Sequence, residues 1–349
     1  MLKRRLNLFV VLSVILVLLA ACGSNKENNA NAGASPSATE PAATTSASPS
    51  AEPSESPAAD VERSIKHVLG ETKIKGTPQK VVVLEWTYAE DLLAVGVQPA
   101  GVSDIENMKK YVALPIELAA DVQEVGTRQE PNLETITALE PDLIIGVKFR
   151  HEKIFDQLSA IAPTLLFDPY PPEGTGDQYQ EMVETFTTIA DVVGKKAEAE
   201  AVLADLQKTF DELRAKLAGA GKEGASIVLA MPYVNQNAIA IRLSTDNSLA
   251  IKILEHIGLN NVYQPEQFEA YGFSTRDVEA LPALQDANYL HMTTDEGVAG
   301  MLEKNSVWTG LNFVKENRTY ALGGDTWPYG GPYAAKIMAE RTTKVLLGE

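Results

Sequence analysis

Short, continuous apolar runs alternate with stretches of helical periodicity from about residue 80 to the end of the chain. This alternation constrains the fold more than any other feature. Strands that are apolar throughout are typical of a sheet covered on both faces, and strands that alternate with helices form βαβ units with a parallel or mixed sheet. The sequence therefore predicts an α/β fold. The expected strands are 81–84, 100–102, 142–147, 164–167, 226–230, 239–241 and 289–292, and the expected helices are 88–95, 153–161, 249–256 and 334–347.

The stretch 178–217 differs from the rest because it has no strand signal. It is rich in Ala, Glu, Lys and Leu, and its apolar residues recur at three- and four-residue spacing, as in Val202, Leu206, Phe210, Leu213 and Leu217. This pattern predicts long helices, with a break or cap at Gly194. We therefore expect an N-terminal α/β lobe at 61–177, a connecting helical segment at 178–220 and a C-terminal α/β lobe at 221–349.

The amino terminus has the composition of an export signal. Lys3, Arg4 and Arg5 precede an apolar run at 8–21. This run is shorter than the about 20 residues of a membrane-spanning helix and is typical of a secretory signal peptide. It ends in Leu-Ala-Ala-Cys-Gly, which resembles the lipobox of bacterial lipoproteins. That resemblance implies removal of 1–21 and diacylation of Cys22, and two acyl chains provide a stable membrane anchor. The alternative is an ordinary signal peptide with a chance cysteine.

Residues 22–60 contain no material for a hydrophobic core. After Cys22 this segment consists mostly of Ala, Ser, Pro and Thr, and it has no aromatic residue and no Val, Leu or Ile. A segment of that composition cannot bury apolar area and is expected to be disordered. We interpret it as a tether between the membrane and the folded part.

The charge and the cysteine count exclude several classes of protein. The 349 residues carry a formal net charge of −17, which argues against nucleic-acid binding because phosphate backbones require a cationic face. A single cysteine excludes an internal disulfide framework and zinc or iron–sulfur sites built from cysteines. The length suits about two domains of roughly 150 residues.

Motifs of the common enzyme classes are missing. The sequence has no G-x-G-x-x-G, Walker A, H-E-x-x-H or G-x-S-x-G motif, and no pair of acids stands out as a general acid and base. The histidines are far apart and form no i,i+4 pair, so a structural role is expected for each, with direct metal binding left open. They are His67, His151, His256 and His291. The chain is therefore not expected to be an enzyme or to hold a cofactor.

Several segments of the α/β part are similar to one family of binding proteins. They are LEWTYAEDLLAVGV at 84–97, VGTR at 125–128, PNLETI at 131–136, LEPDLII at 139–145, RH at 150–151, IAPTLL at 161–166, RLSTDNS at 242–248, GGDTW at 323–327 and GGP at 330–332. Over about 80–347 the chain resembles the extracytoplasmic substrate-binding proteins of iron-siderophore and cobalamin importers. Within that family it is most similar to the branch that binds ferric citrate and citrate-hydroxamate siderophores.

The resemblance implies a fold and a function. The fold is two Rossmann-like α/β lobes joined by a long connecting helix, with the ligand in a cleft between the lobes. The function is capture of a ferric siderophore and its delivery to an ABC permease for iron import. The protein would be a monomer, anchored by lipid to the extracytoplasmic face of the cell membrane. Because the chelator fills the coordination sphere of the iron, no side chain is expected to bind the metal directly.

Three arginines are the expected cations of the site. Arg128, Arg150 and Arg242 end or follow predicted strands, where α/β lobes present ligands. A guanidinium matches the carboxylates of an anionic chelate. The alternative is that these arginines lie on the surface in weak ion pairs. His151 follows one of them and is expected to add a hydrogen bond to the ligand or to orient that arginine.

Aromatic side chains are expected to form the apolar walls of the cleft, because they bury a large area and keep polar groups. The alternative for each is packing in the core. The candidates are Trp86, Tyr88, Tyr233, Trp327 and Tyr329.

Two glutamates are candidates for contact with the permease. Glu134 matches the position at which the first lobe of the family presents a glutamate to arginines of the permease. In the second lobe Arg276 stands where many relatives have an acid, so Glu279 is the expected docking residue there. Three rival functions stay open: a cobalamin- or haem-binding protein of the same fold, an extracytoplasmic α/β hydrolase, and a sensor or adhesin that reuses the fold. The arginines favour an anionic ferric chelate over the neutral corrin.

Overall fold

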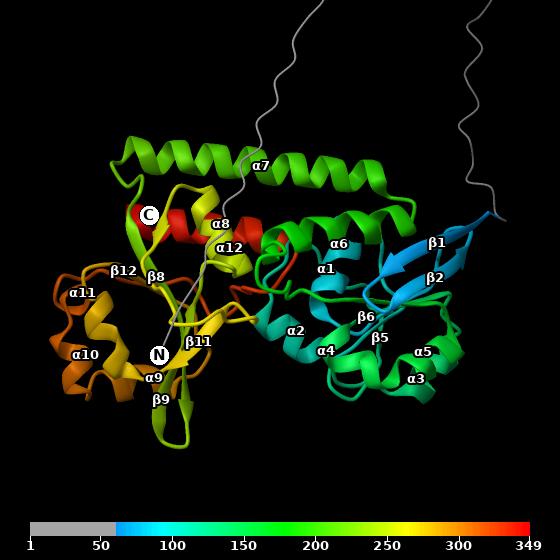
Figure 1. The fold of residues 1–349 in the computed structure, drawn as a ribbon, viewed down its shortest axis with the longest axis horizontal. Coiled ribbons are helices and arrows are strands. Elements are labelled where there is room, and N and C mark those ends of the chain that lie inside the picture. The colour runs from blue at the N-terminus through cyan, green and yellow to red at the C-terminus, as the bar shows by residue number, and fades with distance from the viewer. Residues whose placement is uncertain (1–60) are drawn as a thin grey trace, which may run out of the picture. The chain divides into compact units, whose positions relative to one another are not determined.

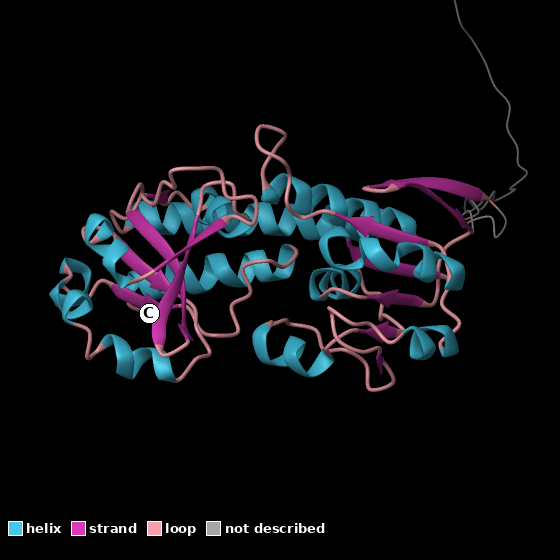
Figure 2. Cartoon of the chain, turned by 60° about the horizontal axis from the view of Figure 1, so that its bottom comes forward, coloured by secondary structure: helices cyan, strands magenta, loops and turns pink. Residues whose placement is uncertain are grey.

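The computed structural model describes residues 61–349. The predicted signal peptide, the predicted tether and Cys22 lie outside the described residues. Within 61–349 no helix is both long enough and apolar enough to span a membrane. The strands of the described part gather in two separate groups, with helices packed on and between them (Figure 1; Figure 2).

The first sheet has five parallel strands in the order β5-β4-β3-β6-β7. Its middle strands, β3 (Val81–Val83) and β6 (Leu143–Val147), are buried along their whole length. The outer strands are β4 (Gly101–Val102), β5 (Gln123–Glu124) and β7 (Thr164–Phe167). The chain runs outward from β3 to β5 and then returns to β6, so the strand order reverses between β3 and β6. Ligands of open α/β sheets bind at such a reversal, beyond the carboxyl ends of the strands.

Helices connect these strands and cover both faces of the sheet. α1 (Trp86–Ala94) follows β3 and is buried at almost every residue. The others are α2 (Ile105–Tyr111), α3 (Leu133–Ala138), α4 (Lys148–His151), η1 (Glu152–Ile154) and α5 (Phe155–Ile161). The helix predicted at 153–161 is therefore shorter than expected, because the chain makes two separate short turns before α5 begins.

A two-stranded antiparallel hairpin precedes the first sheet and is absent from the predicted elements. It consists of β1 (Glu62–His67) and β2 (Gly70–Lys75). The hairpin is attached to β7, since the N–H of Val68 donates to the carbonyl oxygen of Leu166 at 3.0 Å. Ile74 is the one buried residue of its two strands. The hairpin therefore lacks the continuous apolar run by which the other strands are predicted.

The second sheet is mixed, in the order β11-β9-β8-β12-β13, and the short β10 (Asn260–Asn261) also pairs with β8. Its other strands are β8 (Ser226–Asn235), β9 (Ala238–Ser244), β11 (Phe273–Arg276), β12 (Asn288–His291) and β13 (Thr319–Ala321). The β8–β9 and β9–β11 pairs are antiparallel, and the others are parallel. β8 continues beyond the predicted 226–230, because Gln236 and Asn237, both with positive φ, form a two-residue turn into β9.

Two helices connect the sheets. α6 (Gln178–Val192) and α7 (Lys196–Gly219) are separated at Gly194, whose φ is +72°, so the predicted break is confirmed. α6 packs on α1 of the first lobe, and α7 packs on α6 and on α12 (Pro332–Leu347) of the second lobe. The connector thus contacts both lobes, and Figure 1 shows α7 running alongside both groups of strands.

The remaining helices surround the second sheet. α8 (Leu249–His256) has the predicted bounds, and the others are η2 (Val278–Leu284), α9 (Gly297–Leu302), α10 (Ser306–Gly310) and α11 (Asn312–Lys315). Ile227 and Leu229 of β8 belong to the core shared with α8 and α12, whereas Val228 and Ala230 belong to the core shared with η2 and α9. Both faces of this sheet are therefore covered, as its continuous apolar strands predict.

Candidate ligand-binding cleft

Two adjoining cavities lie between the sheets. The larger has a volume of about 470 Å³ and the smaller about 280 Å³, and Arg128 and Trp327 lie in the walls of both. From the first lobe, the residues that line them follow the carboxyl ends of all five parallel strands, β3 to β7, and include β3 and β6 on either side of the reversal in strand order. From the second lobe they come from β8, β9, β11 and α8, from the loop after β12 and from the loop before α12. This is where the fold predicts a ligand site.

Glu85 is the central charged residue of the larger cavity, and it is not among the predicted site residues. It lies between β3 and α1, and its Oε1 is 2.7 Å from Nη1 of Arg128 while its Oε2 is 2.9 Å from Nε of Arg150. Both ion pairs are largely shielded from solvent. Pairing stabilises a buried carboxylate, and here two guanidinium groups share one carboxylate. The signal in the sequence is an acid directly after a buried strand.

Arg128 is held from two sides. Its guanidinium carbon lies 3.4 Å from the centroid of the Trp86 ring, and its Nε is 3.8 Å from Oδ2 of Asp104. Its backbone carbonyl lies 2.9 Å from Nε2 of His151, whose Nδ1 accepts from the N–H of Val147 at 3.0 Å. His151 is fully buried, which lowers the pKa of its ring, and it lines neither cavity. His151 was expected to bind the ligand or to orient Arg150, but its hydrogen-bond partners are the backbone groups of Val147 and Arg128.

Arg242 reaches the larger cavity from β9 of the second lobe. Among residues 61–349 it has no ion-pair partner, and its Nε is enclosed without a hydrogen-bond acceptor. Its guanidinium carbon is 4.7 Å from the ring centroid of Phe273 and 5.5 Å from that of Tyr233. Tyr329 lies beside it in the same cavity; burial raises the pKa of Tyr329, and the charge of Arg242 partly offsets that effect. Tyr233 contacts Arg242 but lines neither cavity.

The two tryptophans line the cavities and also pack in the protein interior. Trp86 is 1% exposed, its Nε1 donates to the carbonyl oxygens of Ser103 and Asp104, and its ring lies 5.0 Å from that of Trp327. Trp86 lines the smaller cavity and Trp327 lines both. Tyr88 is 2% exposed and lines the larger cavity. From the sequence, each of these rings was expected either to line the cleft or to pack in the core. The two alternatives are not exclusive, because these rings are buried and also face a cavity.

An aromatic cluster that sequence reasoning missed joins the two lobes at the wall of the larger cavity. The rings of Tyr170 and Tyr271 are 4.9 Å apart and nearly perpendicular, and the ring of Phe149 is 5.4 Å from that of Tyr170. Phe149 and Tyr271 are exposed despite their size. Tyr170 and Tyr271 lie in loops, where no apolar periodicity marks them.

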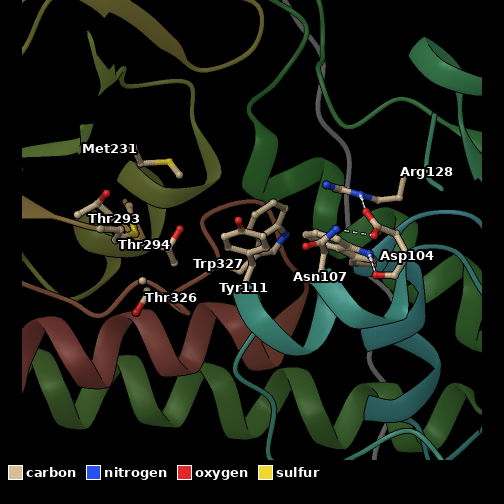
Figure 3. Close-up of a pocket in the computed structure, with 12 residues that line it drawn as sticks. Asp104, Asn107, Tyr111, Arg128, Met231, Thr293, Thr294, Thr326 and Trp327 are labelled. Carbon is tan, nitrogen blue, oxygen red and sulfur yellow. Dashed lines mark hydrogen bonds and ion pairs between the residues drawn. The ribbon is translucent and has the colours of Figure 1, made fainter. Parts of the chain in front are cut away.

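The two sides of the smaller cavity carry different kinds of side chain (Figure 3). On the side of the first lobe lie Asp104, Asn107 and Tyr111, next to Arg128. The second lobe contributes a thioether and hydroxyls, from Met231, Thr293, Thr294 and Thr326. These side chains combine apolar contact with hydrogen bonding and bring no further cation.

The predicted docking glutamates are both on the surface. Glu134 is exposed in the first turn of α3, and Glu279 is exposed in η2. None of the four histidines lines either cavity. Among residues 61–349 no three His, Cys, Asp or Glu side chains gather closely enough to hold a metal ion.

Comparison with known proteins agrees with this architecture. A family model described as periplasmic binding protein matches residues 81–326. The Fe(3+)-citrate-binding protein YfmC of Bacillus subtilis is 30% identical over 326 residues, which cover 92% of this chain and 91% of that protein. The Fe(3+) dicitrate-binding periplasmic protein FecB of Escherichia coli is 29% identical over 279 residues, which cover 79% of this chain and 87% of that protein.

A solved structure has the same arrangement of lobes. The siderophore-binding protein FhuD of Vibrio cholerae, bound to Fe3+-Desferal, is 29% identical and superposes with a TM-score of 0.70, covering 77% of this chain and 98% of that one. The predicted fold class, two α/β lobes joined by a helical connector, is therefore confirmed. Proteins of the matched family bind solutes for transport and are not enzymes, which confirms the expectation that this chain is not an enzyme. With a family model matching most of its length, the chain belongs to the periplasmic binding protein family.

Proposed function

We propose that this protein captures a ferric siderophore in the cleft between its lobes and delivers it to an ABC permease for iron import. The observation that carries the proposal is the arginine set of the larger cavity. Arg128 and Arg150 share the carboxylate of Glu85, Arg128 also lies 3.8 Å from Asp104, and Arg242 has no ion-pair partner among the described residues. An anionic or oxygen-rich ligand would supply the missing acceptors.

The proposed ligand is a ferric chelate of the citrate or citrate-hydroxamate type. Carboxylate and hydroxamate oxygens accept the planar, forked hydrogen bonds that guanidinium groups donate. YfmC and FecB, the relatives described above, are ferric-citrate-binding proteins by name and support this class. A neutral corrin would leave the arginines without acceptors, so the cobalamin alternative is less favoured. The chelator is expected to hold the iron without a protein ligand.

The proposed cellular setting follows from the amino-terminal signal. A chain diacylated at Cys22 would stay on the extracytoplasmic face of the cell membrane, next to its permease. Each lobe presents one exposed glutamate, Glu134 in α3 and Glu279 in η2, as a candidate contact for permease arginines. Relatives named as lipoproteins support the anchor.

A tryptophan-fluorescence titration of the detergent-solubilised full chain tests the proposal. Trp86 and Trp327 flank Arg128, so a ferric chelate bound there should quench their emission. The probes are ferric citrate, ferric schizokinen, ferrioxamine B, a ferric catecholate and cobalamin. The variant Trp308→Phe is the control and should show the same quenching. Trp308 packs against Tyr289 and Phe313 and lines neither cavity. Saturable quenching by none of the ferric chelates would refute the function.

A further inference from the structure

Two helices that carry none of the cavity's arginines also line the larger cavity. α6 presents Gln178, Glu181, Met182 and Thr185 to the cavity, a spacing that places all four on one face of the helix. α1, which packs on α6, presents Tyr88 and Asp91. We call Tyr88, Asp91 and Glu181 the acidic end of the cavity.

Two side chains of the acidic end are deeply buried and lack a partner. Asp91 is 1% exposed and Tyr88 is 2% exposed. Within residues 61–349 neither the carboxylate of Asp91 nor the hydroxyl of Tyr88 has a hydrogen bond or an ion pair, and Oδ1 of Asp91 is fully enclosed. Buried polar groups in folded proteins are almost always paired. Oδ1 of Asp91 is enclosed next to Gly331, so a partner from the cavity is expected to reach Asp91 through Oδ2 and Tyr88 through its hydroxyl.

The charge of the acidic end is uncompensated. Glu181 accepts one hydrogen bond from the hydroxyl of Thr185, and no cation of the described residues forms an ion pair with it or with Asp91. Two of the three arginines of the cavity are paired with other acids, Glu85 and Asp104. Burial, reinforced by the neighbouring Glu90 and Glu181, holds the pKa of Asp91 well above its usual range, and burial raises the pKa of Glu181 to about 7. A cation bound here would stabilise both ionised carboxylates.

Aromatic walls of the same cavity suit an alkyl chain that carries a cation. Tyr170 and Tyr271 line the same cavity, and their rings pack edge to face. Aromatic rings bury methylene groups and attract an ammonium group over their faces.

We propose that the acidic end of the larger cavity binds a protonated amine on a pendant arm of the ferric siderophore, while the arginines bind the chelate itself. This inference rests on the proposed function and adds a preference to it: among ferric chelates with the same core, the cavity favours the one with an ammonium-bearing arm. The cavity then discriminates between ligands with the same iron-binding core by the charge of the arm.

A matched pair of ligands tests the inference. Ferrioxamine B carries a primary amine that is protonated at pH 7, and N-acetylferrioxamine B has the same ferric core with a neutral arm. We expect the wild-type chain to bind ferrioxamine B at least about tenfold more tightly, which corresponds to about 1.4 kcal/mol. Glu181→Gln and Asp91→Asn, measured separately, should each reduce this preference to less than about threefold. Glu184→Gln removes the same charge from an exposed position of α6 and should keep the preference.

The outcomes separate this inference from the proposed function. Equal affinity of the wild-type chain for the two ferrioxamines, or no binding of either, overturns the inference, and water then fills the acidic end. Ferric citrate in the same titration decides the function, because its capture needs only the arginines. If ferric citrate and the other ferric chelates all fail to bind, both the inference and the proposed function are refuted.

Discussion

The carboxylate of Glu90 in α1 accepts a hydrogen bond from the backbone N–H of Ala334 in the first turn of α12, with Oε1 and N 2.8 Å apart. This contact joins the first lobe to the second, and Glu90 is fully buried. The positive end of the α12 dipole favours the ionised carboxylate, but burial outweighs it and raises the pKa of Glu90 to about 7. The junction between the lobes therefore contains a group that titrates near neutral pH.

The first prediction concerns the pH dependence of stability. Because the pKa of Glu90 is about 7 in the folded chain and 4.5 ordinarily, the folded state binds more protons between these values. Ionising Glu90 thus costs stability as the pH rises through this window, by about 3 kcal/mol in total. Glu90→Gln keeps an oxygen acceptor for Ala334 and avoids that cost. Its melting temperature should match that of the wild type near pH 4.5 and exceed it increasingly up to pH 8. Glu340→Gln, an exposed change on α12, is the control, and a gain independent of pH would contradict the prediction.

The second prediction concerns the arginines. Arg128→Ala and Arg150→Ala should each weaken binding of ferric citrate at least about tenfold, or roughly 1.4 kcal/mol, because each removes a charged donor and leaves Glu85 short of one partner. Arg214→Ala changes an exposed arginine of α7 and should leave the affinity unchanged. The measurement is the fluorescence titration described above. Unchanged affinity in both cleft variants would place the site elsewhere.

The third prediction concerns Gly331, the residue before α12. A Cβ there would lie 2.4 Å from Oδ1 of Asp91, although the φ of −95° suits alanine. Gly331→Ala should therefore destabilise the chain by about 1–3 kcal/mol through overpacking, measured by thermal or urea unfolding. Adding Asp91→Ala should restore most of the loss by removing the clash. Gly219→Ala, at a helical glycine with open space around it, should not destabilise.

The fourth prediction separates binding from delivery. Glu134→Ala and Glu279→Ala lie on the surface, away from both cavities, and should leave the affinity for the ferric chelate unchanged. If these glutamates contact the permease, cells that carry the variants should take up radiolabelled iron chelate more slowly. Glu130→Ala, an exposed change near α3, is the matched control. Uptake at the wild-type rate in both variants would remove them as docking residues.

Sequence periodicity located most of the regular elements. β7 at Thr164–Phe167 and α8 at Leu249–His256 have the predicted bounds, and Gly194 separates α6 from α7 as expected. These predictions succeed because burial of a strand or of a helix face imposes its own apolar period. The β1–β2 hairpin escapes prediction because its strands are half exposed and leave no apolar run.

The sequence predicted only part of the candidate site. Arg128, Arg150 and Arg242 are brought to one cavity, as the resemblance implies, although their role in binding stays a prediction. Its place directly after a buried strand marks Glu85 in the sequence, but its pairing with two of the arginines leaves no local pattern, since Glu85 is separated by 43 residues from Arg128 and by 65 from Arg150. Tyr170 and Tyr271 likewise meet across the lobes from two loops.

The sequence by itself determined the α/β class and the order of lobe, connector and lobe, because these follow from composition and from periods within a short stretch of chain; the export signal stays a prediction. The tertiary structure decided which charges are compensated. It paired Glu85 with two arginines, left Arg242 without an ion-pair partner among the described residues, and buried Asp91 without one. The energy of a charge depends on its burial and on partners distant in the chain, and no local pattern of residues records either.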